Sequence, residues 1–261
     1  MQLSELKVIV TGAARGMGAH FAARLAEGGA QVVATDVDEA GLEALPRGIH
    51  RRTCNVAVES ETVELVKWAH EQMGGLNGLV NNAGIIKDGL VVRENRETGE
   101  LVKFDTKAWQ AVLDVNLTGA FLCSLKVLPG MISRGKGRII NVSSICGLKG
   151  FSHMAAYCAS KHGLIGFTRS LSSEVGDKGV TVNAVCPGWV DTPLTHMAAQ
   201  NIADKSSSSV DDILNSFRAR HPQNRLFTPQ EVSEVIAFLA SDGAGGINGQ
   251  TVAIDGGELA G

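Results

Sequence analysis

The sequence predicts an α/β domain: a doubly wound parallel β-sheet of about seven strands with helices on both faces. Its short Val- and Ile-rich runs are continuously hydrophobic rather than alternating, which is typical of strands covered on both faces. The runs are KVIVT (7–11), QVVAT (31–35), GLVN (78–81), RIINV (138–142), VTVNAV (180–185) and TVAI (251–254). Longer amphipathic stretches separate them, so strand and helix alternate six or seven times, as in a parallel doubly wound sheet.

Two of the intervening stretches show helical signals directly. Leu65, Trp68, Ala69 and Met73 recur near helical spacing. The run EVSEVIAFLA at 231–240 repeats that pattern after Thr228 and Pro229, a capping residue followed by proline at the first helical position. We therefore expect helices over both stretches.

Two further segments interrupt the alternation within what we expect to be a single domain, residues 1–261. Residues 87–106 alternate apolar and polar side chains on either side of Glu97-Thr98-Gly99-Glu100, which predicts a β-hairpin inserted between the strand at 78–81 and its helix. Residues 190–227 contain no strand signal and are long enough to form a substrate lid. The serines at 206–209 are equally consistent with a simple flexible turn.

Composition excludes several classes of protein. The 24 Lys and Arg against 27 Asp and Glu give a net charge of −3, too balanced for a nucleic-acid or membrane-surface binder. No segment approaches the about 20 apolar residues of a membrane span, and the amino terminus lacks the pattern of a signal peptide. The five cysteines are far apart with no C-x-x-C pair, so we expect reduced thiols and a cytoplasmic protein.

A glycine-rich turn after the first strand indicates a dinucleotide site. Thr11-Gly12-Ala13-Ala14-Arg15-Gly16-Met17-Gly18 opens a helix, so its backbone N–H groups can face a pyrophosphate at the positive helix end. Asp36 ends the second strand 24 residues after Gly12, where a carboxylate meets the adenosine ribose hydroxyls of NAD. Asp36 would repel the 2′-phosphate of NADP and Val37 offers it no cation, whereas Arg15 could help to hold a phosphate. We predict NAD as the cofactor.

The glycine spacing and later motifs resemble the short-chain dehydrogenase/reductase family along the whole chain, which implies a Rossmann-type dehydrogenase domain. The matching motifs are Asn81-Asn82-Ala83-Gly84, Val115-Asn116, Val142-Ser143-Ser144, Tyr157-Cys158-Ala159-Ser160-Lys161, Pro187-Gly188, Asn248-Gly249-Gln250 and Asp255-Gly256-Gly257. The resemblance also implies a homotetramer, in which the helices beginning near Asp105 and Ala155 pack across a dimer interface.

Four residues are the candidate catalytic set: Asn116, Ser144, Tyr157 and Lys161. On a helix, Tyr157 and Lys161 share one face, and an ammonium beside a phenol favours the phenolate, bringing its pKa of ~10 toward the working pH. Tyr157 could then act as acid or base. By the resemblance, Ser144, 13 residues before Tyr157, polarises the substrate oxygen and Asn116 holds a water near Lys161. Ser143 is expected to form structural hydrogen bonds. The alternatives are that Ser143 instead of Ser144 polarises the substrate, and that Asn116 is only a buried helix amide.

The resemblance implies a cofactor site made of Gly12, Arg15, Gly16, Met17, Gly18, Asp36, Val37, Asn55, Val56, Asn82, Ala83, Gly84, Tyr157, Lys161, Pro187, Gly188, Val190 and Thr192. Val190 and Thr192 would contact the carboxamide, and Lys161 would also hold the nicotinamide ribose. At Asn55 many members carry Asp; an Asn carbonyl can also accept the adenine amino group. The seven histidines show no metal-ligand spacing, so we expect no metal.

We therefore expect an oxidoreductase that transfers a hydride between NAD(H) and a neutral, fairly apolar secondary alcohol or ketone. The segment CPGWVDTPL (186–194) resembles 3-hydroxybutyrate dehydrogenases, but the positions that would pair a carboxylate are Ile86, Cys146 and Met154. Leu148, Phe151, Trp189, Leu194 and Met197 are further candidates for an apolar wall; Arg93, Arg96 and Lys205 are the basic residues that could reach the site instead.

Two other functions are alternatives to this expectation. One is an NADPH-dependent 3-oxoacyl thioester reductase, which Asp36 disfavours. The other, of a different class, is a catalytically inactive NAD-binding regulatory protein, which would have little need for the four catalytic side chains together. A sugar-nucleotide epimerase is disfavoured by the glycine spacing and by the length of the chain.

Overall fold

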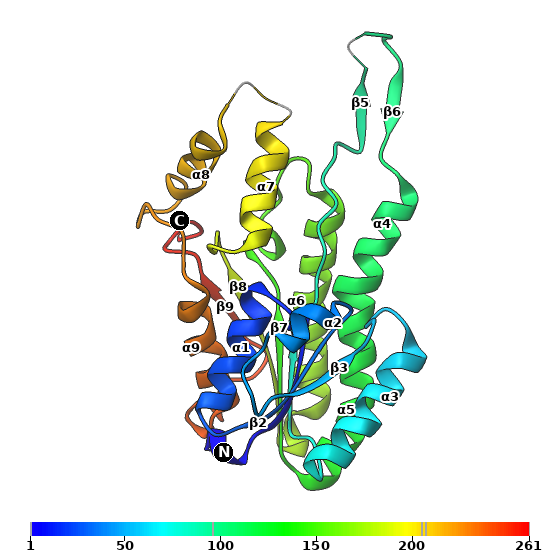
Figure 1. Cartoon of the computed structure of the whole chain (residues 1–261), viewed down its shortest axis with the longest axis vertical. Coiled ribbons are helices and arrows are strands. Elements are labelled where there is room, and N and C mark those ends of the chain that lie inside the picture. The colour runs from blue at the N-terminus through cyan, green and yellow to red at the C-terminus, as the bar shows by residue number, and fades with distance from the viewer. Residues whose placement is uncertain (1, 96, 205, 207, 261) are drawn as a thin grey trace.

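The computed structural model describes residues 2–95, 97–204, 206 and 208–260, which form a seven-stranded parallel sheet flanked by helices (Figure 1). The strand order is β3-β2-β1-β4-β7-β8-β9. The strands are β1 (Lys7–Thr11), β2 (Gln31–Asp36), β3 (His50–Thr53), β4 (Gly78–Asn81), β7 (Gly137–Val142), β8 (Val180–Pro187) and β9 (Thr251–Ile254). The predicted fold class is confirmed.

The strand that the sequence did not reveal is β3, with the sequence HRRT. It forms one edge of the sheet and pairs only with β2 among the described strands, in register from Val33↔His50 to Asp36↔Thr53. A continuous apolar run marks a strand buried on both faces, and an edge strand is free of that requirement. Its polar sequence therefore gave no strand signal.

Helices cover both faces of the sheet. Two apolar cores, one on each face, hold them in place. On one face lie α1 (Gly16–Glu27), α2 (Glu39–Glu43) and α9 (Pro229–Ala240); on the other lie α3 (Glu59–Met73), α5 (Gly119–Arg134) and α6 (Ala155–Val175). Thr228 caps α9 in a reciprocal arrangement with Glu231, and Pro229 occupies the first turn. Short helical turns lie at η1 (Leu3–Glu5), η3 (Ile145–Gly147), η4 (Gly176–Lys178) and η5 (Asp242–Ala244).

The segment Thr106–Arg134 corrects one expectation from the sequence. Here α4 (Thr106–Leu113), η2 (Asp114–Thr118) and α5 follow one another without a break, giving 29 residues that are long and apolar enough to cross a membrane by length and composition alone. Core helices of soluble proteins meet the same criterion, and 44% of the apolar window is buried within the chain. The expectation that no segment approaches the length of a membrane span was therefore wrong. One such helix is only weak evidence for a membrane span.

Two segments extend from the carboxyl end of the sheet (Figure 1). The antiparallel strands β5 (Val92–Glu94) and β6 (Leu101–Lys103) project beyond the body, and Gly89 N at their base donates to His153 O at 2.8 Å. The second segment carries α7 (Pro193–Ala203) and α8 (Val210–Arg218). Its two ends are joined, because Asp191 N donates to Phe227 O and Phe227 N to Trp189 O, at 2.8 and 2.9 Å. Arg96 and Lys205 lie outside the described residues.

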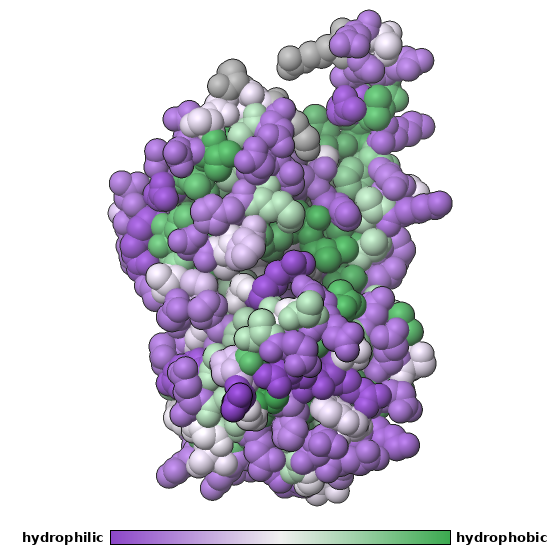
Figure 2. All heavy atoms as spheres, viewed as in Figure 1, coloured by the Kyte–Doolittle hydropathy of each residue, from purple (hydrophilic) through white to green (hydrophobic). Residues whose placement is uncertain are grey.

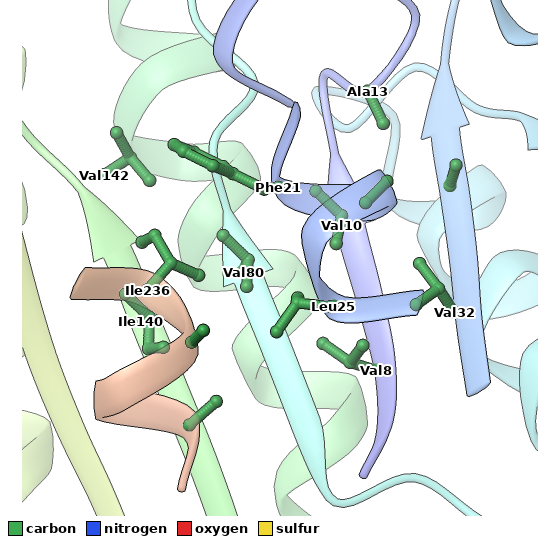
Figure 3. Packing of buried hydrophobic residues seen from close by; sticks show 14 of the residues in the cluster. Val8, Val10, Ala13, Phe21, Leu25, Val32, Val80, Ile140, Val142 and Ile236 are labelled. Atoms are coloured by element: carbon green, nitrogen blue, oxygen red, sulfur yellow. The ribbon is translucent and has the colours of Figure 1, made fainter. Parts of the chain in front are cut away.

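The larger core is centred on Phe21 of α1. This side chain is 0% exposed, and Figure 3 shows it lying over the sheet toward Val80 and Val142. Ile236 of α9 packs in the same cluster, so α1 and α9 share one apolar face. Because α1 begins directly after the glycine-rich turn, this packing also fixes the start of that helix.

We predict that Phe21→Ala lowers the free energy of unfolding by about 3–5 kcal/mol, because it leaves a cavity between α1 and the sheet. Urea unfolding followed by circular dichroism measures the change. The matched control is Phe238→Ala on α9, whose ring is 48% exposed and whose loss should cost less than about 0.5 kcal/mol. Equal losses in the two variants would contradict this account of the core.

Candidate active site

The glycine-rich turn leaves no room for side chains at two positions. Gly12 has a φ of 65°, and a Cβ there would lie 2.7 Å from Ala83 Cα. A Cβ on Gly18 would lie 2.1 Å from Gly12 O. The backbone is therefore packed tightly against β4 and exposes the amino end of α1 at Gly16, an arrangement that fits a bound pyrophosphate.

Hydrogen bonds between β1 and β4 hold this turn in place. Thr11 Oγ1 accepts from the backbone N–H groups of Asn82 and Ala83, each at 3.0 Å. In return, the Asn82 side-chain amide donates to Thr11 O and Gly12 O, each at 2.9 Å. The side chain of Asn82 thus fixes the turn, a contact that the sequence alone did not specify.

Asp36 lies at the end of β2, beside the turn. Its Oδ2 accepts from Ala14 N at 3.0 Å and its Oδ1 from Asp38 N at 3.1 Å. Val37 is 69% exposed. Asp38, which was not among the predicted site residues, lies 3.9 Å from Arg15 Nη1 through its Oδ2. The basic side chain inside the turn therefore already has an acidic partner.

Asn55 and Val56 follow β3 at the neighbouring strand end. The Asn55 side-chain oxygen accepts from Ala57 N at 3.1 Å, while its backbone N–H donates to Glu61 at 2.8 Å. The amide group thus organises its own loop, and a carbonyl oxygen can accept a second hydrogen bond. Val56 is buried.

Tyr157 and Lys161 lie on one face of α6, four residues apart. The Lys161 ammonium is buried, lies 5.5 Å from the centre of the Tyr157 ring, and donates to Val142 O at 2.8 Å. Burial lowers the pKa of Lys161 to about 8 because desolvation disfavours the charged form. The ammonium is thus held between the end of β7 and the phenol.

The expectation that Lys161 lowers the pKa of Tyr157 is corrected by the structure. Burial of the phenol raises its pKa, the nearby Cys146 thiol adds to this, and a hydrogen-bonding contact with the Ser144 side chain opposes it. Burial of the phenol is the largest of these effects, and the Lys161 ammonium donates to a backbone carbonyl instead of the phenol oxygen. In the chain by itself the phenol is therefore protonated.

The two adjacent serines have different surroundings. Ser143 is buried and donates to Lys161 O at 3.0 Å, which ties β7 to α6. Ser144 Oγ accepts from Cys146 N at 3.1 Å, and its side chain contacts the phenol of Tyr157. Accepting that bond leaves the Ser144 hydroxyl proton available for another oxygen.

Asn116 is buried in η2 and has partners for both ends of its amide. Its Oδ1 accepts from Ile85 N at 2.8 Å, and its Nδ2 donates to Ile85 O and Ser160 Oγ, both at 3.0 Å. A Cβ on Gly84 would lie 3.4 Å from Asn116 Oδ1 and 3.6 Å from Lys161 Nζ. The absent side chain at Gly84 therefore lets Asn116 and Lys161 face a shared space.

A cavity beside Ser144 and Tyr157 collects residues from distant parts of the chain. Met17, Pro187, Gly188, Val190 and Thr192, which are among the predicted cofactor residues, line it. Its other wall includes five of the predicted apolar residues: Ile86, Cys146, Met154, Trp189 and Leu194. Leu148, Phe151 and Met197 do not line it. Figure 2 shows apolar side chains gathered between α7 and the base of the hairpin.

The cysteines include one close pair that their spacing in sequence did not indicate. All five thiols are free and buried. Cys146 and Cys158 belong to one buried cluster, and a hydrogen bond between the thiols raises the pKa of Cys146 and lowers that of Cys158. Within the described ranges, no group of three or more His, Cys, Asp or Glu side chains is arranged to hold a metal ion.

Comparisons with known proteins agree with this geometry. A family model described as enoyl-(acyl carrier protein) reductase, within the short-chain dehydrogenase/reductase family, matches residues 12–258. The 3-oxoacyl-[acyl-carrier-protein] reductase FabG of Vibrio cholerae is 38% identical, and cis-4-hydroxycyclohexanecarboxylate dehydrogenase of Sinomonas cyclohexanicum is also 38% identical; each match covers 98% of both chains. A variant of actinorhodin polyketide ketoreductase, crystallised with NADPH, superposes with a TM-score of 0.89 at 36% identity over 99% of each chain.

The family match spans nearly the whole chain, and the site combines a glycine-rich dinucleotide turn with a Tyr, Lys and Ser group beside an apolar cavity. The chain belongs to the short-chain dehydrogenase/reductase family and is an oxidoreductase that acts on CH–OH or keto groups.

Proposed function

We propose that this enzyme transfers a hydride between NAD(H) and a secondary alcohol or ketone that is uncharged and fairly apolar around its reacting carbon. The observation that carries the proposal is the cavity in which Ser144 and Tyr157 face a wall of Ile86, Cys146 and Met154. An uncharged reacting end gains from burial there, at about 25 cal/mol per Å² of apolar area.

We assign Tyr157 as the acid and base, with Ser144 as the donor to the substrate oxygen. The bound nicotinamide supplies or accepts the hydride. The protonated phenol can donate to a ketone oxygen as negative charge develops there, and the free proton of Ser144 can stabilise the same oxygen. In the oxidation direction Tyr157 accepts the alcohol proton.

Lys161 and Asn116 support the proton transfer in this assignment. A bound cofactor would bring its nicotinamide ribose to Lys161, whose lowered pKa lets the side chain exchange protons near neutral pH. Asn116 and Lys161 face the space at Gly84, where Asn116 would hold the relay water. In this proposal we place the segment 190–227 over the substrate as a lid.

The proposal of NAD rests on the acidic end of β2. Asp36 and Asp38 lie together where a ribose 2′-phosphate would have to bind, and Arg15 is already adjacent to Asp38. Like charges disfavour the phosphate of NADP, whereas ribose hydroxyls can donate to Asp36. The hydrogen bonds from Ala14 and Asp38 hold the Asp36 carboxylate in place.

The second candidate is an NADPH-dependent 3-oxoacyl thioester reductase. It is favoured by the FabG relatives and by the ketoreductase structure with NADPH. Both candidates use the same catalytic group and differ at Asp36 and in the length of the substrate. The relative that acts on a hydroxycyclohexane ring supports an alicyclic alcohol.

Tyr157→Phe keeps the ring and removes the proton that is transferred, so kcat should fall by at least about 10²-fold. NADH titration should show unchanged cofactor binding. His162→Ala is the control: this neighbour of Lys161 is exposed, so its loss should change kcat by less than about twofold. Substantial activity in Tyr157→Phe would remove the phenol from the mechanism.

For the cofactor, we predict that kcat/KM favours NAD over NADP by at least about tenfold, because a carboxylate pair repels the 2′-phosphate. Asp36→Ala should weaken the binding of NAD and reduce the preference for NAD over NADP in kcat/KM. Asp36→Asn removes the charge but keeps one oxygen that can accept from Ala14 N, so comparing it with Asp36→Ala helps to separate repulsion from loss of structure. Asp38→Asn should raise kcat/KM with NADP, because it releases Arg15 from its acidic partner. A preference of the unmodified enzyme for NADPH would favour the thioester reductase.

The apolar wall predicts activity on alicyclic, aryl or medium-chain secondary alcohols. It also predicts at least about tenfold lower kcat/KM on 3-hydroxybutyrate, because a carboxylate next to the carbinol is desolvated without a partner, at a cost of several kcal/mol. Met154→Lys places a cation in the wall and should narrow this difference. Initial rates with each alcohol measure it, and the reverse order of substrates would contradict the apolar reacting end.

A further inference from the structure

Two cationic side chains from separate segments converge on one aromatic ring near the cavity. Lys149 follows η3, and Arg220 lies just after α8. The Lys149 ammonium is 5.7 Å from the centre of the Phe151 ring and the Arg220 guanidinium is 5.8 Å from it. Both side chains belong to exposed residues, so their charged ends are open to a ligand.

Neither cation forms an ion pair with a carboxylate of the described residues. Glu258 is an acidic group that interacts with both cations: burial raises the pKa of its carboxyl, and the charges of Arg220 and Lys149 oppose that rise. The Glu258 side chain is nearly inaccessible and lies 3.9 Å from His221 Nε2 through its Oε2. The two cations are therefore exposed at this surface, whereas the carboxyl that interacts with them is buried.

Aromatic side chains connect these cations to the reacting groups. Arg220 also lies 5.8 Å from the centre of the Trp189 ring, and Trp189 lines the cavity beside Tyr157. Phe151, Trp189 and Tyr157 pack against the same buried cluster. Trp189 is itself held in place, because its ring stacks on that of Phe217 of α8 with 3.7 Å between the ring centres. Trp189 thus contacts both the apolar cavity at Tyr157 and the cation of Arg220.

We propose that Arg220, assisted by Lys149, determines specificity by binding a carboxylate at the end of the substrate remote from its carbinol. The inference rests on the proposed function and narrows its substrate class to an apolar ring or chain that carries an alcohol at one end and an anion at the other. A carboxylate next to the carbinol, as in 3-hydroxybutyrate, would instead lie against Ile86, Cys146 and Met154. The distance between the two groups therefore decides which hydroxy acids are accepted.

The kinetic test compares two alcohols with the same ring, cis-4-hydroxycyclohexanecarboxylate and 4-methylcyclohexanol. The carboxylate should give the higher kcat/KM, and Arg220→Gln should lower that value by about tenfold, mainly through KM, because a charge-assisted contact is lost. The same variant should change kcat/KM for 4-methylcyclohexanol by less than about twofold. Lys149→Gln should act in the same direction with a smaller effect, and added salt should raise KM for the carboxylate alone.

The matched control is Arg218→Gln. Arg218 is on α8 two residues away, and its guanidinium donates to Asn215 Oδ1 at 2.7 Å. Arg218→Gln should leave kcat/KM for both alcohols unchanged. Arg220→Lys should keep part of the preference for the carboxylate that Arg220→Gln loses. The proposal would be overturned if Arg220→Gln lowered kcat/KM equally for both alcohols, or if the unmodified enzyme gave the carboxylate no higher kcat/KM than 4-methylcyclohexanol.

A binding measurement separates this inference from the proposed function. Cyclohexanecarboxylate has no carbinol, so calorimetry with cofactor-saturated enzyme reports binding without turnover. We expect Arg220→Gln to raise the Kd for cyclohexanecarboxylate by about tenfold and Arg218→Gln to leave that Kd unchanged. Failure to oxidise any of the alcohols would refute the proposed function, whereas an equal Kd in Arg220→Gln, or no binding by the unmodified enzyme, would refute the role of Arg220.

Discussion

The hydrogen bonds between Thr11 and Asn82 are the constraint on which the site depends. They join the carboxyl ends of β1 and β4, the point at which the strand order reverses and where doubly wound sheets bind their ligands. The bonds hold the turn so close to β4 that only glycine fits at position 12. The amino end of α1 is thereby directed toward the same edge of the sheet as Ser144 and Tyr157. A loss of this contact would displace the cofactor side and the substrate side of the site together.

Much of the proposed catalytic group is held by backbone atoms. Lys161 is buried against Val142 O, and Ser143 binds the carbonyl of Lys161 in return, so β7 and α6 position the ammonium between them. Burial of a charged group costs stability. Asn116 is held in the same way, by both polar groups of the Ile85 backbone. These contacts fix Lys161 and Asn116 in place within the chain itself, and in the proposed reaction such preorganised groups would stabilise a charged transition state.

The substrate side is assembled from segments that are distant in sequence. Residues of η3, α6, β8 and α7 meet around the cavity, and the pairing of Phe227 with Trp189 and Asp191 closes the segment that carries α7 and α8. That closure brings Arg220 over Trp189, although 31 residues separate them in the chain. Relatives that are each 38% identical to this chain are named for different substrates, from a 3-oxoacyl carrier protein to a hydroxycyclohexane acid. Membership of the family thus does not specify the wall of the cavity.

The sequence by itself determined the parallel sheet and the positions of most strands, because strands buried on both faces require continuous apolar runs. It also determined the glycine turn, since glycine spacing reports a local backbone requirement, and the four-residue spacing that places Tyr157 and Lys161 on one helix face. It did not reveal β3, whose edge position relaxes the need for apolar side chains. The tertiary structure alone decided the pKa of Tyr157, the pairing of Arg15 with Asp38, the contact between Cys146 and Cys158, and the approach of Arg220 to Trp189. Each of these depends on burial or on contacts between separate elements, and neither quantity is encoded in local spacing.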